Sequence, residues 1–263
     1  MDILLYIVMV GLGLVGSFFS GLLGIGGAII NFPLLLYVPS LFGVAQFSAH
    51  EVSSISMFQV FFASLAGVLA FRKKSKKGTA AVVHKGLVVY MGSSILVGSL
   101  IGGLISSYIN GDLINLIYGI LAVLAVILML IPSRGSEDQT TEIRFIKAVA
   151  VISAFLVGIV SGIVGAGGAF ILIPIMLTVL KIPTRTTIAS SLAIVFISAI
   201  GGVLGKITGG GIPLMPTIFT VIGSLVGAPL GSKVSSKINV RVLRYGLVVL
   251  IALTAIKVWS SIL

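Results

Sequence analysis

The sequence predicts an all-α polytopic membrane protein made of two inverted repeats, and three observations lead to this prediction. Of the 263 residues, 58% are hydrophobic and only 9% are charged, and the mean hydropathy is +1.27. The chain also contains long apolar runs, and it repeats its own pattern of glycines. A water-soluble domain needs a more polar surface than this composition allows. We therefore expect the lipid bilayer to be the main solvent of the chain.

Eight main hydrophobic segments are each long enough to cross about 30 Å of hydrocarbon. They lie at residues 3–38, 47–71, 86–107, 113–132, 145–180, 186–205, 214–232 and 242–260. The first and the fifth are nearly twice the length that one crossing needs. The first 30 residues lack a basic region and a small-residue cleavage site. We expect them to belong to the membrane part of the protein and not to a signal peptide.

The first segment of each half carries the same glycine cluster. Residues 20–28 read SGLLGIGGA, residues 161–169 read SGIVGAGGA, and Pro33 and Pro174 follow them. Three further matches keep the same order: Ser53 and Ser54 with Ser190 and Ser191, residues 98–102 with 223–227, and residues 118–119 with 245–246. This collinearity predicts membrane repeats at 1–132 and 148–263, joined by a polar cytoplasmic linker at 133–147.

The basic loops indicate how the repeats lie in the membrane. If each glycine cluster turns its segment back to the side from which it entered, four loops that carry 15 of the 17 Lys and Arg residues face the cytoplasm. These loops are 72–85, 133–147, 181–185 and 233–244. This arrangement satisfies the positive-inside rule and inverts the second repeat. The net charge of +11 is then explained by orientation in the inner or plasma membrane, and no nucleic-acid partner is expected.

The glycine clusters predict a break in the first helix of each repeat. Adjacent glycines unwind an apolar helix, and the exposed backbone groups must face protein, water or a ligand because lipid cannot bond to them. A helix that begins after such a break presents N–H groups and a positive dipole end to an anion. The predicted substrate-binding glycines are Gly24, Gly26, Gly27, Gly165, Gly167 and Gly168. The two arms of each broken segment, of about 14–20 residues, fit either re-entrant hairpins or double crossings.

Polar side chains on apolar segments extend this predicted substrate site. Such groups orient a ligand in an otherwise apolar pocket. They are Asn31, Ser53, Ser54, Gln59, Ser190 and Ser191. The alternative for the serines is a hydrogen bond to their own helix backbone. Asn31 corresponds to Leu172 in the second repeat, so the site is not symmetric there.

Few ionisable side chains stand within or beside the apolar segments. His50 and Glu51 are candidates for proton coupling, or else they lie in water at the interface. Lys206 and Lys257 are expected to snorkel to the membrane boundary. The chain has no cysteine and no Walker-type loop, so we expect no cofactor, no metal site and no use of ATP.

Several other glycines have an ordinary explanation in close helix packing. The pairs 98/102, 158/162, 201/205 and 223/227 have the small-xxx-small spacing that lets membrane helices approach. Residues 11–16, Gly-Leu-Gly-Leu-Val-Gly, spell a dinucleotide-binding fingerprint. No strand–turn–helix pattern surrounds them, so we expect no dinucleotide site.

The paired segments GIGGA at 24–28 and GAGGA at 165–169, with the prolines and serine pairs that follow, resemble the TauE/SafE sulfite exporter family over almost the whole chain. The resemblance implies a permease that moves sulfite, organosulfonates or related small anions, often outward. Together with the predicted breaks, it indicates a secondary carrier, not an enzyme. An anion channel is the first alternative. A membrane-embedded enzyme or assembly factor is less favoured, because His50, Glu51 and His84 make no catalytic cluster.

Overall fold

A computed structural model describes residues 2–23, 28–75, 83–130 and 145–235, and single positions at 249, 252, 256 and 259. Within these ranges the chain forms nine α-helices and no strand. The helices are α1 (Asp2–Leu23), α2 (Ala28–Leu41), α3 (Ala49–Ser75), α4 (Lys85–Ser106), α5 (Gly111–Leu130), α6 (Lys147–Val164), α7 (Ala169–Thr178), α8 (Thr184–Gly209) and α9 (Leu214–Ser235). The predicted all-α membrane fold is confirmed.

The predicted hydrophobic segments correspond to these helices. Segment 3–38 contains α1 and α2, segment 145–180 contains α6 and α7, and segment 242–260 lies almost wholly outside the described residues. In the described part of the chain, the helices long and apolar enough to cross a membrane are α1, α3, α4, α6, α8 and α9. Helix α7 has 10 residues, about 15 Å, which is half of the hydrocarbon thickness. Segment 145–180 thus combines a long arm, α6, with a shorter one, α7.

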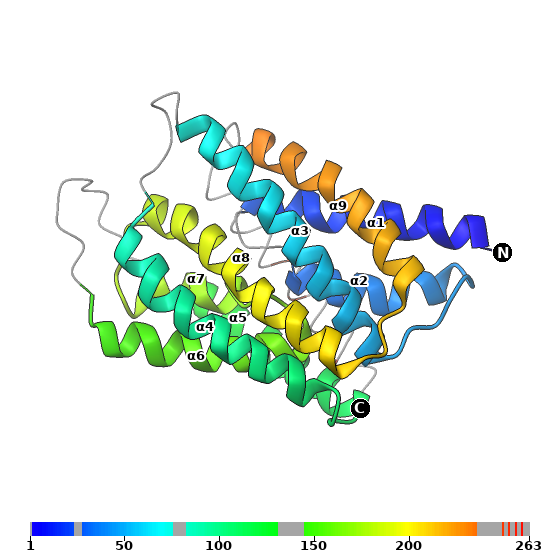
Figure 1. Cartoon of the computed structure of the whole chain (residues 1–263). Coiled ribbons are helices and arrows are strands. Elements are labelled where there is room, and N and C mark those ends of the chain that lie inside the picture. The colour runs from blue at the N-terminus through cyan, green and yellow to red at the C-terminus, as the bar shows by residue number, and fades with distance from the viewer. Residues whose placement is uncertain are drawn as a thin grey trace.

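The long helices form two groups that run in opposite directions. In Figure 1, α1, α3 and α9 run toward one side of the molecule, and α4, α6 and α8 run toward the other. Helix α1 packs along α9, while α4 packs on α6 and α8. The two groups meet where α3 crosses α8. The first helix of each half therefore packs on the fourth helix of the other half.

Equivalent glycine contacts relate the two halves. A Cβ atom added to Gly162 would overlap the Ser99 carbonyl oxygen, and one added to Gly21 would overlap the Ala228 carbonyl oxygen. Gly21 and Gly162 are equivalent in the predicted repeat, so Ala228 is the counterpart of Ser99. The sequence match of residues 98–102 with 223–227 is therefore wrong by four residues, one helical turn. Helix α9 carries glycines at 223, 227 and 231, so its sequence fits either register.

The predicted close-packing role of the glycine pairs is confirmed. A Cβ atom on any of these eight glycines would come within 2.7 Å of a backbone carbonyl oxygen of the neighbouring helix. Small residues let helices approach in lipid because association there depends on packing and not on the hydrophobic effect. The glycines of the fingerprint-like sequence at residues 11–16 lie inside helix α1.

Gly13→Ala is expected to lower the free energy of unfolding by about 1–3 kcal/mol, because the new methyl group would overlap the Thr220 carbonyl oxygen of α9. Gly11→Ala is the matched control, since nothing lies within 4 Å of a Cβ atom there. It should be neutral or stabilise the helix by up to about 1 kcal/mol. Thermal unfolding of both variants in detergent tests this, and equal effects would contradict the packing role of Gly13.

Candidate functional site

A cavity of about 210 Å³ lies where the start of α3 meets the ends of α4 and α8. We call it the lysine cavity. Its walls come from both halves of the chain. It is lined by His50, Ser54, Gly103, Ser106, Ser107, Lys206, Gly209, Gly210 and Gly211. No acidic side chain of the described residues belongs to this lining.

Lys206 is buried at this cavity, with only 4% of its surface exposed. Its Nζ donates hydrogen bonds to Ser106 Oγ and, at 3.2 Å, to the Ile163 carbonyl oxygen. The expectation that Lys206 snorkels to the membrane boundary is wrong, because α4 and α6 cover it and supply its partners. A buried ammonium group without a counter-charge is costly. Lys257 lies outside the described residues.

The Ile163 carbonyl is the point where three helices hold the end of α6. It accepts hydrogen bonds from Ser53 Oγ at 2.7 Å, from Ser106 Oγ at 3.1 Å and from Lys206 Nζ at 3.2 Å. The C-terminal end of a helix carries partial negative charge, which favours a cation there. The end of α6 thus positions Lys206 at the cavity.

The predicted helix break comes directly after the end of α6, and it is confirmed in the second repeat. Helix α6 ends at Val164 and α7 begins at Ala169, and Gly165, Gly167 and Gly168 have φ angles of 78°, 64° and 75°. These are left-handed conformations that favour glycine. Residues 161–174 are all buried, and none of the three glycines lines the cavity. Gly24, Gly26 and Gly27 of the first repeat lie outside the described residues.

The structure separates the serines of the predicted site. Ser54 lines the lysine cavity, and Ser53 binds the end of α6. Ser190 Oγ instead accepts the His84 N–H at 3.1 Å, and Ser191 Oγ donates to the Ile188 carbonyl oxygen at 3.1 Å. These two serines stand 15 or more residues before Lys206 on α8, about 23 Å along the helix. They are not brought to the cavity.

His50 and Glu51 have different surroundings. His50 lines the lysine cavity. The Glu51 carboxylate accepts the Ser48 N–H at 2.8 Å and the Ser48 hydroxyl at 2.9 Å, while Ser48 Oγ accepts the Glu51 N–H at 3.3 Å. This reciprocal pattern is a capping box at the start of α3. It gives Glu51 a structural role beside the cavity.

Asn31 and Gln59 come together in a second polar region, between α1, α2 and α3. Gln59 Nε2 donates to the Gly13 carbonyl oxygen and to Ser17 Oγ, both at 3.3 Å. A Cβ atom on Gly16 would overlap Asn31 Oδ1 and lie 3.0 Å from Gln59 Nε2. Both amides are 1% exposed. We call Ser17, Asn31 and Gln59 the carboxamide cluster.

Of the cavity lining, sequence reasoning predicted only His50 and Ser54 as site residues, and it missed Lys206. The available signal was a single lysine close to the glycine pair 201/205, within an otherwise apolar helix. Among the described residues, no three His, Cys, Asp or Glu side chains gather as metal ligands would.

A known protein family matches almost the whole chain. The family model described as "Sulfite exporter TauE/SafE" matches residues 9–258. The chain belongs to this family. Both the lysine cavity and the carboxamide cluster fall within the matched region.

Similar proteins from several organisms cover most of the chain. It is 24% identical over 254 residues to the "Probable membrane transporter protein YunE" of Bacillus subtilis, covering 90% of each chain. It is 33% identical over 208 residues to a "Probable membrane transporter protein" of Xylella fastidiosa, covering 77% of this chain and 72% of the relative. A relative from Methanocaldococcus jannaschii is 25% identical over 205 residues. No solved structure matches the chain significantly.

Proposed function

We propose that this protein is a secondary transporter that exports a small anion such as sulfite, an organosulfonate or a related sulfur compound. The observation that carries the proposal is Lys206, a buried lysine that faces a cavity without an acidic partner among the described residues. The sulfur chemistry follows from the family description. Relatives described as probable membrane transporters support transport as the activity.

An anion in the lysine cavity would supply the missing counter-charge. An ammonium group has three N–H donors, and two of those of Lys206 are used by Ser106 and Ile163. The third is available to a ligand. His50, Ser54 and Ser107 add polar groups around it. At about 30 Å³ for each water molecule, the cavity volume suits a small oxyanion or a short sulfonate.

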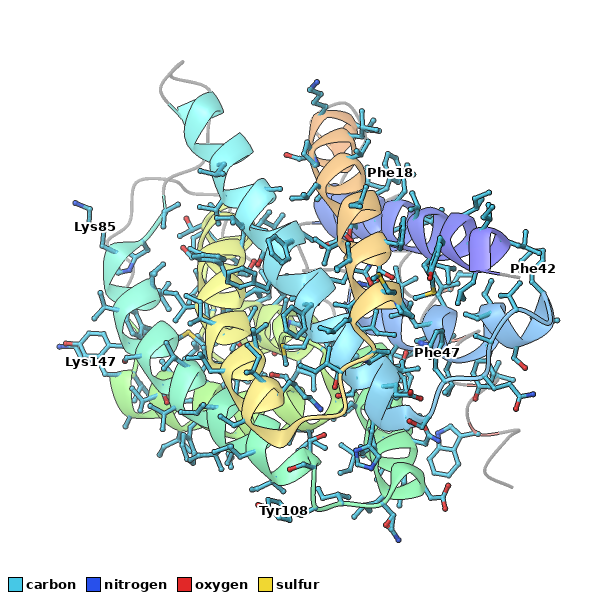
Figure 2. The ribbon with its side chains drawn as sticks, turned by 45° about the vertical axis from the view of Figure 1, so that its right-hand side comes forward. Phe18, Phe42, Phe47, Lys85, Tyr108 and Lys147 are labelled. Carbon is cyan, nitrogen blue, oxygen red and sulfur yellow. The ribbon has the colours of Figure 1, made fainter. Side chains whose placement is uncertain are left out.

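The direction of the helices relates the cavity to the two sides of the membrane. Figure 2 shows Lys85 and Lys147, at the starts of α4 and α6, on one side of the molecule, and Tyr108, just after α4, at another end. The cavity lies at the Tyr108 end of α4. With the basic loops 72–85, 133–147, 181–185 and 233–244 in the cytoplasm, the lysine cavity opens on the extracytoplasmic side.

The break next to the cavity offers a place for the conformational change of a carrier. Residues 165–168 join a long arm to a short one, and Ile163 links this break to Lys206. Ligand binding that draws Lys206 away from Ile163 would remove one of the hydrogen bonds that hold the end of α6. The equivalent break at 24–27 would move in the same way in the opposite half-cycle of alternating access.

Exchange in proteoliposomes tests the proposal. We expect saturable uptake of radiolabelled sulfite or a small sulfonate that is accelerated by the same unlabelled anion inside the vesicles, and no such uptake in protein-free liposomes. Uptake that does not saturate and ignores the internal anion would indicate a channel. The absence of anion flux through folded, reconstituted protein would reject transport of these anions.

A further inference from the structure

We propose that the carboxamide cluster is a second binding site for the transported anion, halfway across the membrane, and that it recognises a protonated oxyanion. This inference rests on the proposed transport function. It assigns a ligand to Asn31 and Gln59. The cluster contains no charged side chain, so it would bind the anion through hydrogen bonds alone, whereas the lysine cavity offers Lys206.

The cluster has more hydrogen-bonding atoms than partners. Asn31 Nδ2, Asn31 Oδ1 and Gln59 Oε1 are buried and have no hydrogen-bond partner among the described residues. The two hydrogen bonds of Gln59 Nε2 are both long, at 3.3 Å, and their acceptor at Gly13 is shared with Ser224 Oγ at 3.4 Å. Buried polar groups are almost always paired with protein or with an ordered molecule. Three such atoms on two neighbouring amides leave room for a bound molecule to supply the missing partners.

The depth of the cluster in the helix bundle suits a transport site. Gln59 and Ser224 each stand ten residues after the first residue of α3 and α9, and Gly13 stands eleven after the first residue of α1. At 1.5 Å per residue they lie about 15 Å from those helix ends, half of the hydrocarbon thickness. Lys206 stands three residues before the end of α8, about 5 Å from that end. Substrate sites of inverted-repeat carriers lie near the midplane.

The unpaired atoms indicate the chemistry of the ligand. Asn31 Nδ2 is an unpaired donor for oxyanion oxygens, whereas Asn31 Oδ1 and Gln59 Oε1 are acceptors that need a donor. A fully deprotonated oxyanion such as sulfate offers acceptors only. A protonated oxyanion such as hydrogensulfite offers acceptor oxygens and one proton donor, and its single charge is easier to bury than a double charge. The cluster is therefore matched to the protonated form.

Gly16 gives the two amides the space that they need. A methyl group at this position would take the place of Asn31 Oδ1. The last glycine of the fingerprint-like sequence at residues 11–16 thus has a role that is unrelated to nucleotides: it lets Asn31 and Gln59 approach the backbone of α1.

Asn31→Leu is the variant that tests the site, because leucine occupies the equivalent position 172 of the second repeat. It removes two unpaired polar atoms, so thermal unfolding in detergent should occur at the same or a higher temperature. Sulfite exchange should nevertheless fall at least tenfold. Asn115→Leu is the matched control: Asn115 on α5 also has a buried Oδ1 without a partner among the described residues, and it lies outside the cluster. This control should exchange sulfite at the wild-type rate.

Three results would overturn the inference while wild-type transport stands. Wild-type exchange in Asn31→Leu would mean that the cluster holds only water. Exchange of radiolabelled sulfate by the wild type as fast as that of sulfite would reject recognition of a protonated ligand. Full activity in Asn31→Asp, together with a requirement of the wild type for Na⁺, would mean that the cluster binds a cation. A wild-type protein that exchanges no anion would instead reject the proposed function itself.

Discussion

Lys206→Met is expected to reduce anion exchange by roughly a thousandfold and to leave the protein folded. A cation and an anion 4 Å apart attract each other by about 4 kcal/mol at an effective dielectric constant of about 20. Each 1.4 kcal/mol corresponds to about a factor of ten in binding. Methionine keeps the length of the side chain, and replacing a buried charge by an apolar group is often neutral or stabilising. Ser106 retains its hydrogen bond to Ile163.

Lys85→Met is the control for Lys206→Met. Lys85 is exposed at the start of α4, at the other end of that helix from the cavity, so its replacement changes the net charge equally without touching the site. Exchange in reconstituted proteoliposomes should be lost in the first variant and kept in the second. If Lys206→Met exchanged sulfite as the wild type does, the anion site would have to be sought outside the lysine cavity.

Gly165→Ala is expected to destabilise the protein by roughly 2–5 kcal/mol. Its φ of 78° costs an alanine about 1–2 kcal/mol. A Cβ atom would also overlap the Ser53 carbonyl oxygen of α3, and such overpacking costs about a further 1–3 kcal/mol. Neither α3 nor α6 can move away freely, because Ser53 also donates a hydrogen bond to Ile163. The measurement is the midpoint of thermal unfolding in detergent.

Gly43→Ala separates the two contributions at Gly165. Gly43 also has a positive φ, of 64°, but nothing lies within 4 Å of a Cβ atom there. Its replacement should cost only the conformational part, about 1–2 kcal/mol. Equal destabilisation by the two variants would show that close contact between the break and α3 contributes nothing to stability.

The helical architecture could be predicted largely from the sequence, because it depends on local properties. An apolar run of sufficient length must be a helix in lipid, where every backbone group needs an internal partner. Adjacent glycines such as Gly167 and Gly168 interrupt that helix regardless of how the rest of the chain folds. Glycine pairs at a spacing of four leave a flat helix face that a neighbouring helix fills. These inferences needed no knowledge of which helices meet.

The sites depended on which helices meet, and this was decided by the tertiary structure. The sequence placed Lys206 near the end of an apolar segment, where a free helix would let it reach water, but α4 and α6 enclose it. Ser190 resembled Ser53 in the repeat, yet it binds the backbone at His84.

By itself the sequence determined the membrane class, the helices, the second-repeat break and the close-packing glycines of this protein. Only the tertiary structure decided the register of α9 against α1, the burial of Lys206 and the meeting of Asn31 with Gln59. The physical reason is that hydrophobicity and backbone freedom are properties of each residue, whereas burial and hydrogen-bond partners are properties of pairs of residues far apart in the chain.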